Sequence, residues 1–193
     1  MFHNNENSDF LTYEHTVCPT KEQKGLLAAR FDQEDGVYNT LAGLVNQSYS
    51  QGAGLEELKA LVRNHPIPAG NEVDRFAISQ LRKRIISLLP RLCSGKMSCI
   101  KPRRADRSQR SAYYRYVRIS DYHLVLPMIG SIAMEQHRAL TKGARIYGAT
   151  VYADCNSAFY HVALHMIVPK QVVDTAPVQY RNVVGMDYAQ DGH

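Results

Sequence analysis

The sequence predicts an α+β fold in which a small antiparallel β-barrel carries an inserted bundle of helices. Three observations lead to this prediction. After one short strand, the first half of the chain repeats its apolar residues at helical spacing. Beyond about residue 110, apolar and polar residues alternate in short runs that are typical of strands. The 193 residues are 45% hydrophobic and 21% charged, which supplies enough apolar material for a buried core.

Local signals predict the elements of the first half. Residues 11–17 alternate apolar and polar side chains, as a strand does. Thr20 and Gln23 form a capping-box pattern, which predicts a helix over residues 20–31. Helical periodicity predicts three more helices: residues 34–49, the segment LEELKALVRN, and residues 72–92 with most of its basic side chains outward.

The second half is predicted to be mainly strands. Residues 95–109 have no periodicity, which indicates a basic loop or linker. Five strands are expected after it, in residues 113–119, 123–129, 131–137, 144–153 and 158–168. In the last of these strands, His161 and His165 lie on the side opposite an apolar set, so their spacing does not indicate a metal site.

Composition excludes several classes of protein. The most apolar stretch, residues 124–134, contains Pro127 and Gly130 and is much shorter than the ~20 residues of a membrane-spanning helix. Residues 1–10 lack the basic and apolar regions of a secretory signal. The four cysteines do not have zinc-ligand spacing, so we expect reduced thiols in a cytosolic protein.

Charge is strongly segregated along the chain. Residues 75–118 contain 13 of the 23 Lys and Arg residues and one of the 18 acidic residues, a net charge of +12. The remainder carries 10 basic and 17 acidic residues, a net charge of −7. Such a segment indicates a polyanion partner. An anionic membrane fits less well, because no amphipathic basic helix with an aromatic face accompanies the cluster.

Tyrosines accompany the basic cluster. They alternate with arginines in the order Tyr113, Tyr114, Arg115, Tyr116, Arg118 and Tyr122. Arginine for phosphates and tyrosine for stacking or sugar contacts is a common pairing in nucleic-acid grooves. The alternative is a strand edge whose tyrosines are half-buried against the core.

Four segments in the same order resemble the TnpB family, the transposon-encoded RNA-guided nucleases ancestral to the type V CRISPR effectors. They are VCPTKEQKGLLAARFDQEDGVYNTL, HLVLPMIGSIAMEQHRAL, YADCNSAFYHVALHMIV and VVGMDYAQDG. The resemblance implies a wedge (OB-like) barrel in residues 1–19 and 111–180 and a helical recognition insert in residues 20–110, with its basic loop at 95–110. Residues 181–193 would begin a RuvC-like (RNase H-like) nuclease domain.

The resemblance implies the N-terminal part of an RNA-guided DNA endonuclease that binds a guide RNA and target DNA. Such a protein reads only a short duplex motif beside the target. Its nuclease domain holds two Mg²⁺ ions through three acidic residues, of which Asp187 matches the first, both as catalytic residue and as metal ligand. The other two acids and the family's zinc ribbon are not in these residues, so we expect that the 193-residue chain alone does not hydrolyse DNA.

The resemblance also assigns nucleic-acid contacts. Arg75, Phe76 and Ser79 match residues that face the motif-bearing duplex, and Tyr113 and Tyr114 lie near its other contact. The family more often has a longer amide side chain in place of Ser79, so we expect a different motif here. Phosphate contacts are expected at Arg82, Lys83, Arg84, Arg103, Arg104 and Arg107. Lys101, Arg110 and Arg115 complete the predicted nucleic-acid-binding set.

Two other functions remain open at this point. The protein could be a truncated or nuclease-deficient RNA-guided DNA binder that acts as a repressor, or a plain basic RNA-binding module. In each case the expected location is the bacterial or archaeal cytoplasm, at the nucleoid.

Overall fold

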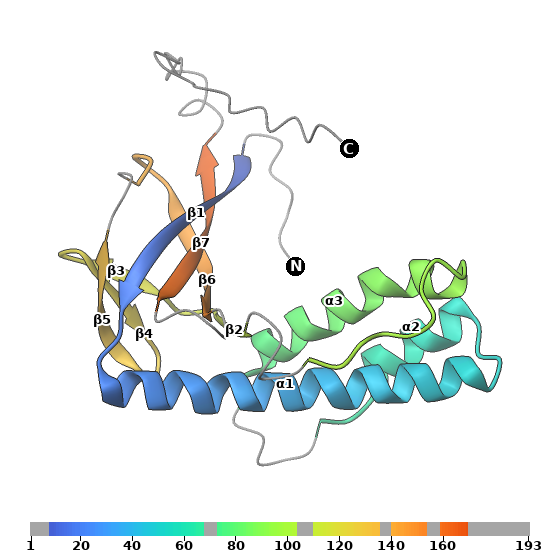
Figure 1. Ribbon diagram of the computed structural model, residues 1–193. Helices are drawn as coiled ribbons and strands as arrows, with labels where there is room; N and C mark the ends of the chain where they lie inside the picture. Colours follow the sequence, from blue (N-terminus) through green and yellow to red (C-terminus); the bar gives the residue numbers. More distant parts are fainter. Residues whose placement is uncertain (1–7, 68–72, 104–109, 136–139, 154–158, 170–193) are drawn as a thin grey trace, which may run out of the picture.

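The computed structural model describes residues 8–67, 73–103, 110–135, 140–153 and 159–169. Within them the chain forms three helices and one antiparallel sheet of seven strands, which confirms the predicted α+β class (Figure 1). The helices are α1 (Lys21–Ser50), α2 (Leu55–Asn64) and α3 (Arg75–Cys93). The strands are β1 (Ser8–Cys18), β2 (Arg110–Tyr114), β3 (Arg118–Ser120), β4 (His123–Leu126), β5 (Gly130–Glu135), β6 (Arg145–Ala153) and β7 (Tyr160–Pro169).

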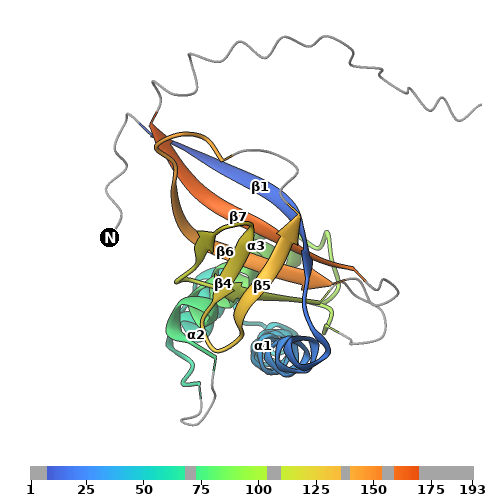
Figure 2. The same ribbon diagram turned by 90° about the vertical axis from the view of Figure 1, so that its left-hand side faces the viewer.

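The sheet is curled into half of a barrel, as Figure 2 shows. Its strand order is β2-β6-β7-β1-β5-β4-β3, so β2 and β3 are its two edges. These edges are joined by residues 115–117 alone, which can span at most ~14 Å between the last Cα of β2 and the first of β3. The sheet therefore has to curl until its two edges are close.

Helix α1 extends along both halves of the molecule (Figure 1). Near its start, Leu27 and Phe31 pack into the core of the sheet. Farther along, Leu41 and Val45 pack with α2 and α3 in a second, helical core. Two consecutive tyrosines of β2 follow the same division, because Tyr114 belongs to the sheet core and Tyr113 to the helical core. The helix thus fixes the helical part against the sheet.

The sequence predicted two helices where α1 is continuous. The capping box at its start is confirmed, since the Gln23 backbone N–H donates to Thr20 Oγ1 at 3.3 Å and the Thr20 N–H donates to Gln23 Oε1 at 3.0 Å. The expected break falls in an acidic stretch in which Asp32 and Asp35 are paired with arginines from elsewhere in the chain. Gly36 does not interrupt the helix either. No other atom lies within 4 Å of the place where its Cβ would be, and glycine in a helix lowers stability by only ~1 kcal/mol relative to alanine.

Other differences are local. Helix α3 begins three residues later than predicted, where the Asp74 carboxylate accepts the N–H groups of Phe76 and Ala77 at 2.6 and 3.0 Å. The strand predicted over residues 113–119 divides into β2 and β3, because the chain there crosses from one edge of the sheet to the other. The described part of the chain has no helix of the length and apolar character needed to cross a membrane.

Candidate nucleic-acid interface

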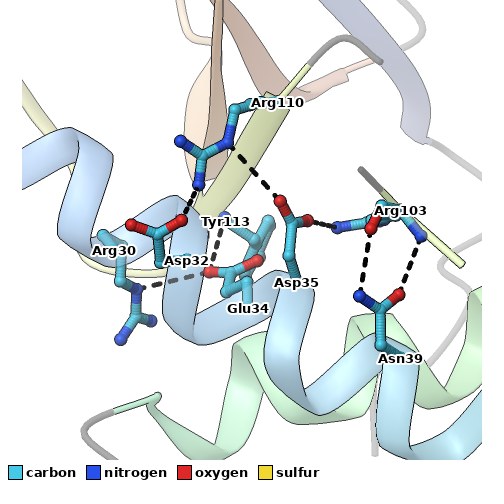
Figure 3. Close-up of polar contacts among 8 residues, drawn as sticks. All are labelled: Arg30, Asp32, Glu34, Asp35, Asn39, Arg103, Arg110 and Tyr113. Atoms are coloured by element: carbon cyan, nitrogen blue, oxygen red, sulfur yellow. Dashed lines mark hydrogen bonds and ion pairs between the residues drawn. The ribbon is translucent and has the colours of Figure 1, made fainter. Parts of the chain in front are cut away.

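The basic segment between α3 and β2 is fastened to α1. The side-chain amide of Asn46 donates to the Ile100 carbonyl at 2.9 Å and accepts the Ile100 N–H at 2.8 Å. Asn39 holds the backbone of Arg103 in the same two-bond manner, at 3.0 and 2.7 Å (Figure 3). Because Ile100 is fully buried as well, this part of the predicted loop has a fixed course along the helix.

Two arginines of the predicted nucleic-acid-binding set are paired with acids of α1 (Figure 3). Arg103 Nη1 lies 3.1 Å from Asp35 Oδ1, and the Arg103 guanidinium stacks on the ring of Tyr38 at 4.4 Å. Arg110 forms ion pairs with both Asp32 and Asp35. A phosphate would therefore compete with two carboxylates for the Arg110 guanidinium. The charge count along the sequence did not reveal this pairing.

Glu34 is a buried carboxylate at the centre of this region. Its Oε1 lies 3.3 Å from Arg30 Nε and accepts the Tyr113 N–H at 3.1 Å (Figure 3). Burial raises its pKa from 4.5 to about 7, although the positive charge of Arg30 and the bond from Tyr113 act in the opposite direction. The protonation of Glu34 therefore changes near neutral pH, at the contact between α1 and β2.

Aromatic rings and guanidinium groups from three separate segments lie together on one surface, which we call the cationic-aromatic strip. Its members are Arg75 and Phe76, Arg115 and Tyr116, and Tyr147. The Phe76 ring lies edge-on to Tyr116, with 5.9 Å between centroids. The guanidinium groups of Arg75 and Arg115 lie 5.0 and 5.3 Å from the same Phe76 ring. Tyr116 is 68% exposed. Such a surface can contact both phosphates and bases.

Arg115 links the strip to the sheet. Its Nη1 donates to the Tyr147 carbonyl at 2.8 Å, and its guanidinium lies 5.9 Å from the Tyr147 ring. The Tyr147 ring in turn lies 5.8 Å from the imidazole of His165 on β7. Through Tyr147 the strip therefore continues to His165, on the face of the sheet opposite its apolar core.

A pocket of about 280 Å³ opens where the helices meet the sheet, and we call it the corner pocket. Gln80 and Arg84 line it from α3, one helical turn apart on the same face as Phe76. Tyr147, Thr150 and His165 line it from the sheet. His165 Nε2 and Thr150 Oγ1 are hydrogen-bonded at 2.9 Å, which fixes the ring.

The corner pocket is lined by two arginines and by the carboxyl group of Glu34, which is paired with Arg30. Arg84 and Arg103 both line it, and the Arg84 guanidinium has no hydrogen-bond or ion-pair partner among the described residues. Loss of hydration lowers the pKa of Arg84, and repulsion by Arg103 lowers it further. An anion in the pocket would relieve this repulsion.

The remaining predicted contacts are dispersed. Ser79, Lys83 and Lys101 are exposed, whereas Arg82 donates from Nη2 to the His65 carbonyl at 2.6 Å and so ties α3 to the end of α2. Tyr113 and Tyr114 are only 7% and 5% exposed, so both rings belong to core packing, as in the strand-edge alternative. Arg104, Arg107 and Asp187 lie outside the described residues.

Sequence reasoning missed Tyr147, Gln80 and His165 as members of the site. One local signal was present, since Tyr147 directly precedes Gly148 inside a strand. A Cβ atom at Gly148 would lie 2.3 Å from the Tyr113 hydroxyl oxygen, so the glycine allows a buried ring to cross the strand. Nothing local indicates Gln80 or His165, because only the fold places them together.

No group of three potential metal ligands from His, Cys, Asp and Glu occurs in the described part of the chain. Of the cysteines placed there, Cys18, Cys93 and Cys99 are free thiols. In comparison with known proteins, the chain matches neither a family model nor a curated protein.

Proposed function

We propose that the chain binds a guide RNA and its target DNA, as the N-terminal part of an RNA-guided DNA endonuclease of the TnpB type. The observation that supports this most is the continuity of the cationic-aromatic strip with the corner pocket. Arg84 offers a cation without a carboxylate partner among the described residues. Tyr116 offers an exposed ring in contact with Phe76, over which two guanidinium groups lie. Phosphate and base contacts need these groups side by side.

In this proposal the curled sheet is the wedge barrel and the three helices are the recognition insert. Arg75 and Ser79 face the duplex that bears the target-adjacent motif, and Lys83 and Arg84 contact phosphates. Base pairing with the guide supplies the rest of the sequence specificity. Cleavage belongs to the nuclease domain that Asp187 opens, with Mg²⁺, so binding is the activity assigned to the described residues.

The experiment is to purify the protein from its native cells and to sequence the RNA that remains bound. We expect a discrete species with a constant scaffold and a variable segment. Bulk ribosomal fragments, together with no target-dependent binding to duplex DNA, would show a plain basic RNA-binding module instead. Addition of Mg²⁺ and a guide-matched plasmid then separates a nuclease from a nuclease-deficient binder. The 193-residue chain alone is expected to leave the plasmid intact.

A further inference from the structure

A second pocket, of about 340 Å³, lies on the other side of β2 from the corner pocket. We call it the turn pocket, because the turn between β4 and β5, residues 127–129, forms one wall. The facing wall is α1, with the apolar side chains of Leu26 and Ala29. Asp74, Arg30 and Tyr114 supply polar groups. Apolar walls with a few converging polar groups are the usual composition of a small-molecule pocket.

The hydroxyl of Tyr114 is buried and has no hydrogen-bond partner in the described part of the chain. The residue is 5% exposed, and no hydrogen-bond acceptor for this oxygen exists among the described residues. Burial raises the pKa of Tyr114, so the group stays protonated and can donate. Burial of a hydroxyl without a hydrogen bond is unfavourable by about 1–3 kcal/mol. A ligand that accepts this hydrogen bond would remove the penalty.

The turn that forms the wall is held in place and presents an apolar side chain. The side-chain amide of Gln23 on α1 donates to the carbonyls of Ser131 and Ile129, at 2.8 and 3.5 Å. Met128, at the tip of the turn, has a φ of +66° and is 90% exposed. A left-handed backbone at a residue other than glycine is unfavourable, and such positions cluster at binding sites. Methionine also packs adaptably against flat rings.

The polar groups of the pocket complement guanine best among the four bases. Asp74 Oδ2 lies 3.5 Å from Arg30 Nη2, and the Asp74 side chain is 44% exposed, so its carboxylate is accessible as an acceptor. Guanine places two N–H donors beside a carbonyl oxygen. The donors suit the Asp74 carboxylate, and the oxygen suits the Tyr114 hydroxyl. Adenine lacks the carbonyl, while uracil and cytosine each present fewer donors to the carboxylate.

Asp74 also connects the turn pocket to the cationic-aromatic strip. It is the N-cap of α3, and the next two residues, Arg75 and Phe76, belong to the strip. We infer that the turn pocket binds an unstacked guanine base of the nucleic acid that lies on the strip. This inference rests on the proposed function and adds to it a specific base-binding site.

The test measures the binding of guanosine to the whole chain by saturation-transfer NMR. Guanosine has no phosphate, so the cations of the corner pocket contribute nothing to its binding. We expect guanosine to bind more tightly than adenosine, cytidine or uridine. Tyr114→Phe, which removes only the hydroxyl, should weaken guanosine binding about tenfold, the effect of one hydrogen bond. Tyr122→Phe, at a tyrosine that is 68% exposed, is the matched control and should have no effect.

A stability measurement shows whether the variant is folded. Because the hydroxyl has no partner in the segments that the structure describes, Tyr114→Phe should unfold at the same or a higher temperature than the wild type. Absence of guanosine binding, a preference for another nucleoside, or unchanged binding in Tyr114→Phe would each overturn the inference. If RNA is retained but guanosine does not bind, only the guanine site is wrong. If guanosine binds but RNA does not, the pocket holds a free nucleoside and both proposals fail.

Discussion

Glu34 and Tyr113 join the longest helix to the edge of the sheet through a single buried hydrogen bond, from the Tyr113 N–H to the Glu34 carboxylate at 3.1 Å. Glu34 is 2% exposed, and its carboxylate forms an ion pair with Arg30 at 3.3 Å. The bond lies between the sheet core and the helical core, since Tyr113 and Tyr114 point into different ones. The charge state of Glu34 therefore affects how strongly the helical core is held to the sheet core.

The stability of the protein should fall as the pH rises through this titration. The pKa of Glu34 is raised from 4.5 to about 7, so between these values the folded chain holds a proton that the unfolded chain has released. The folded state therefore loses stability with rising pH, by up to ~3 kcal/mol at about 1.4 kcal/mol per pKa unit. Urea unfolding at a series of pH values should show this fall for the wild type and a smaller one for Glu34→Gln. Glu22→Gln, at an exposed carboxylate, should follow the wild type; parallel curves for all three would contradict the assignment.

Gly148 should not tolerate a side chain. Its missing Cβ would lie 2.3 Å from the Tyr113 hydroxyl oxygen and 2.7 Å from the ring, and Tyr113 is only 7% exposed. We expect Gly148→Ala to destabilise the protein by about 1–3 kcal/mol, as overpacking does. The control is Gly43→Ala in α1, where nothing lies within 4 Å and the better helix former should stabilise by up to ~1 kcal/mol. Equal unfolding midpoints for the two variants would show that the strand adapts.

Asn46 should be needed to hold the basic segment on α1. Its amide makes both of the hydrogen bonds to Ile100, at 2.9 and 2.8 Å. Asn46→Ala leaves a buried N–H and a buried C=O unpaired, which should cost about 1–3 kcal/mol. Amide hydrogen exchange at Ile100 should become faster, whereas Gln47→Ala on the exposed face should leave it unchanged. An unaltered exchange rate in Asn46→Ala would mean that the packing of the Ile100 side chain is sufficient.

The elements that the sequence predicted well are those with local signals. Helix α2 has the predicted bounds, Leu55–Asn64, because Gly54 precedes it and a proline follows it closely. The start of α1 follows from a capping box of adjacent residues. The continuity of α1 could not be predicted in this way, since its acidic stretch is paired with Arg103 and Arg110, 68 and 78 residues away.

The candidate nucleic-acid interface also depends on contacts between residues far apart in the sequence, so only part of it could be predicted. Charge along the chain identified the basic segment, and Arg75, Phe76 and Arg115 do lie together. The charge count did not distinguish Arg110, which is paired with two carboxylates, from Arg84, which has no carboxylate partner among the described residues. Alternation placed the tyrosines on a strand, but whether a ring faces the core or solvent depends on which strand lies beside it. Tyr147 enters the site because β6 pairs with both β2 and β7.

Arg84 should contribute more to RNA binding than other basic residues of α3. It lines the corner pocket and has no carboxylate partner among the described residues, so it can release a counterion when a phosphate binds. Each such contact changes the slope of log affinity against log salt by ~0.7 for single strands. We expect Arg84→Gln to weaken the binding of a single-stranded RNA and to flatten its slope by about this amount. Arg91→Gln, at an exposed arginine in the last turn of α3, removes the same charge without altering the pocket. Equal slopes for the two variants would show that the RNA responds to net charge alone, and the corner pocket would then have no special part in binding.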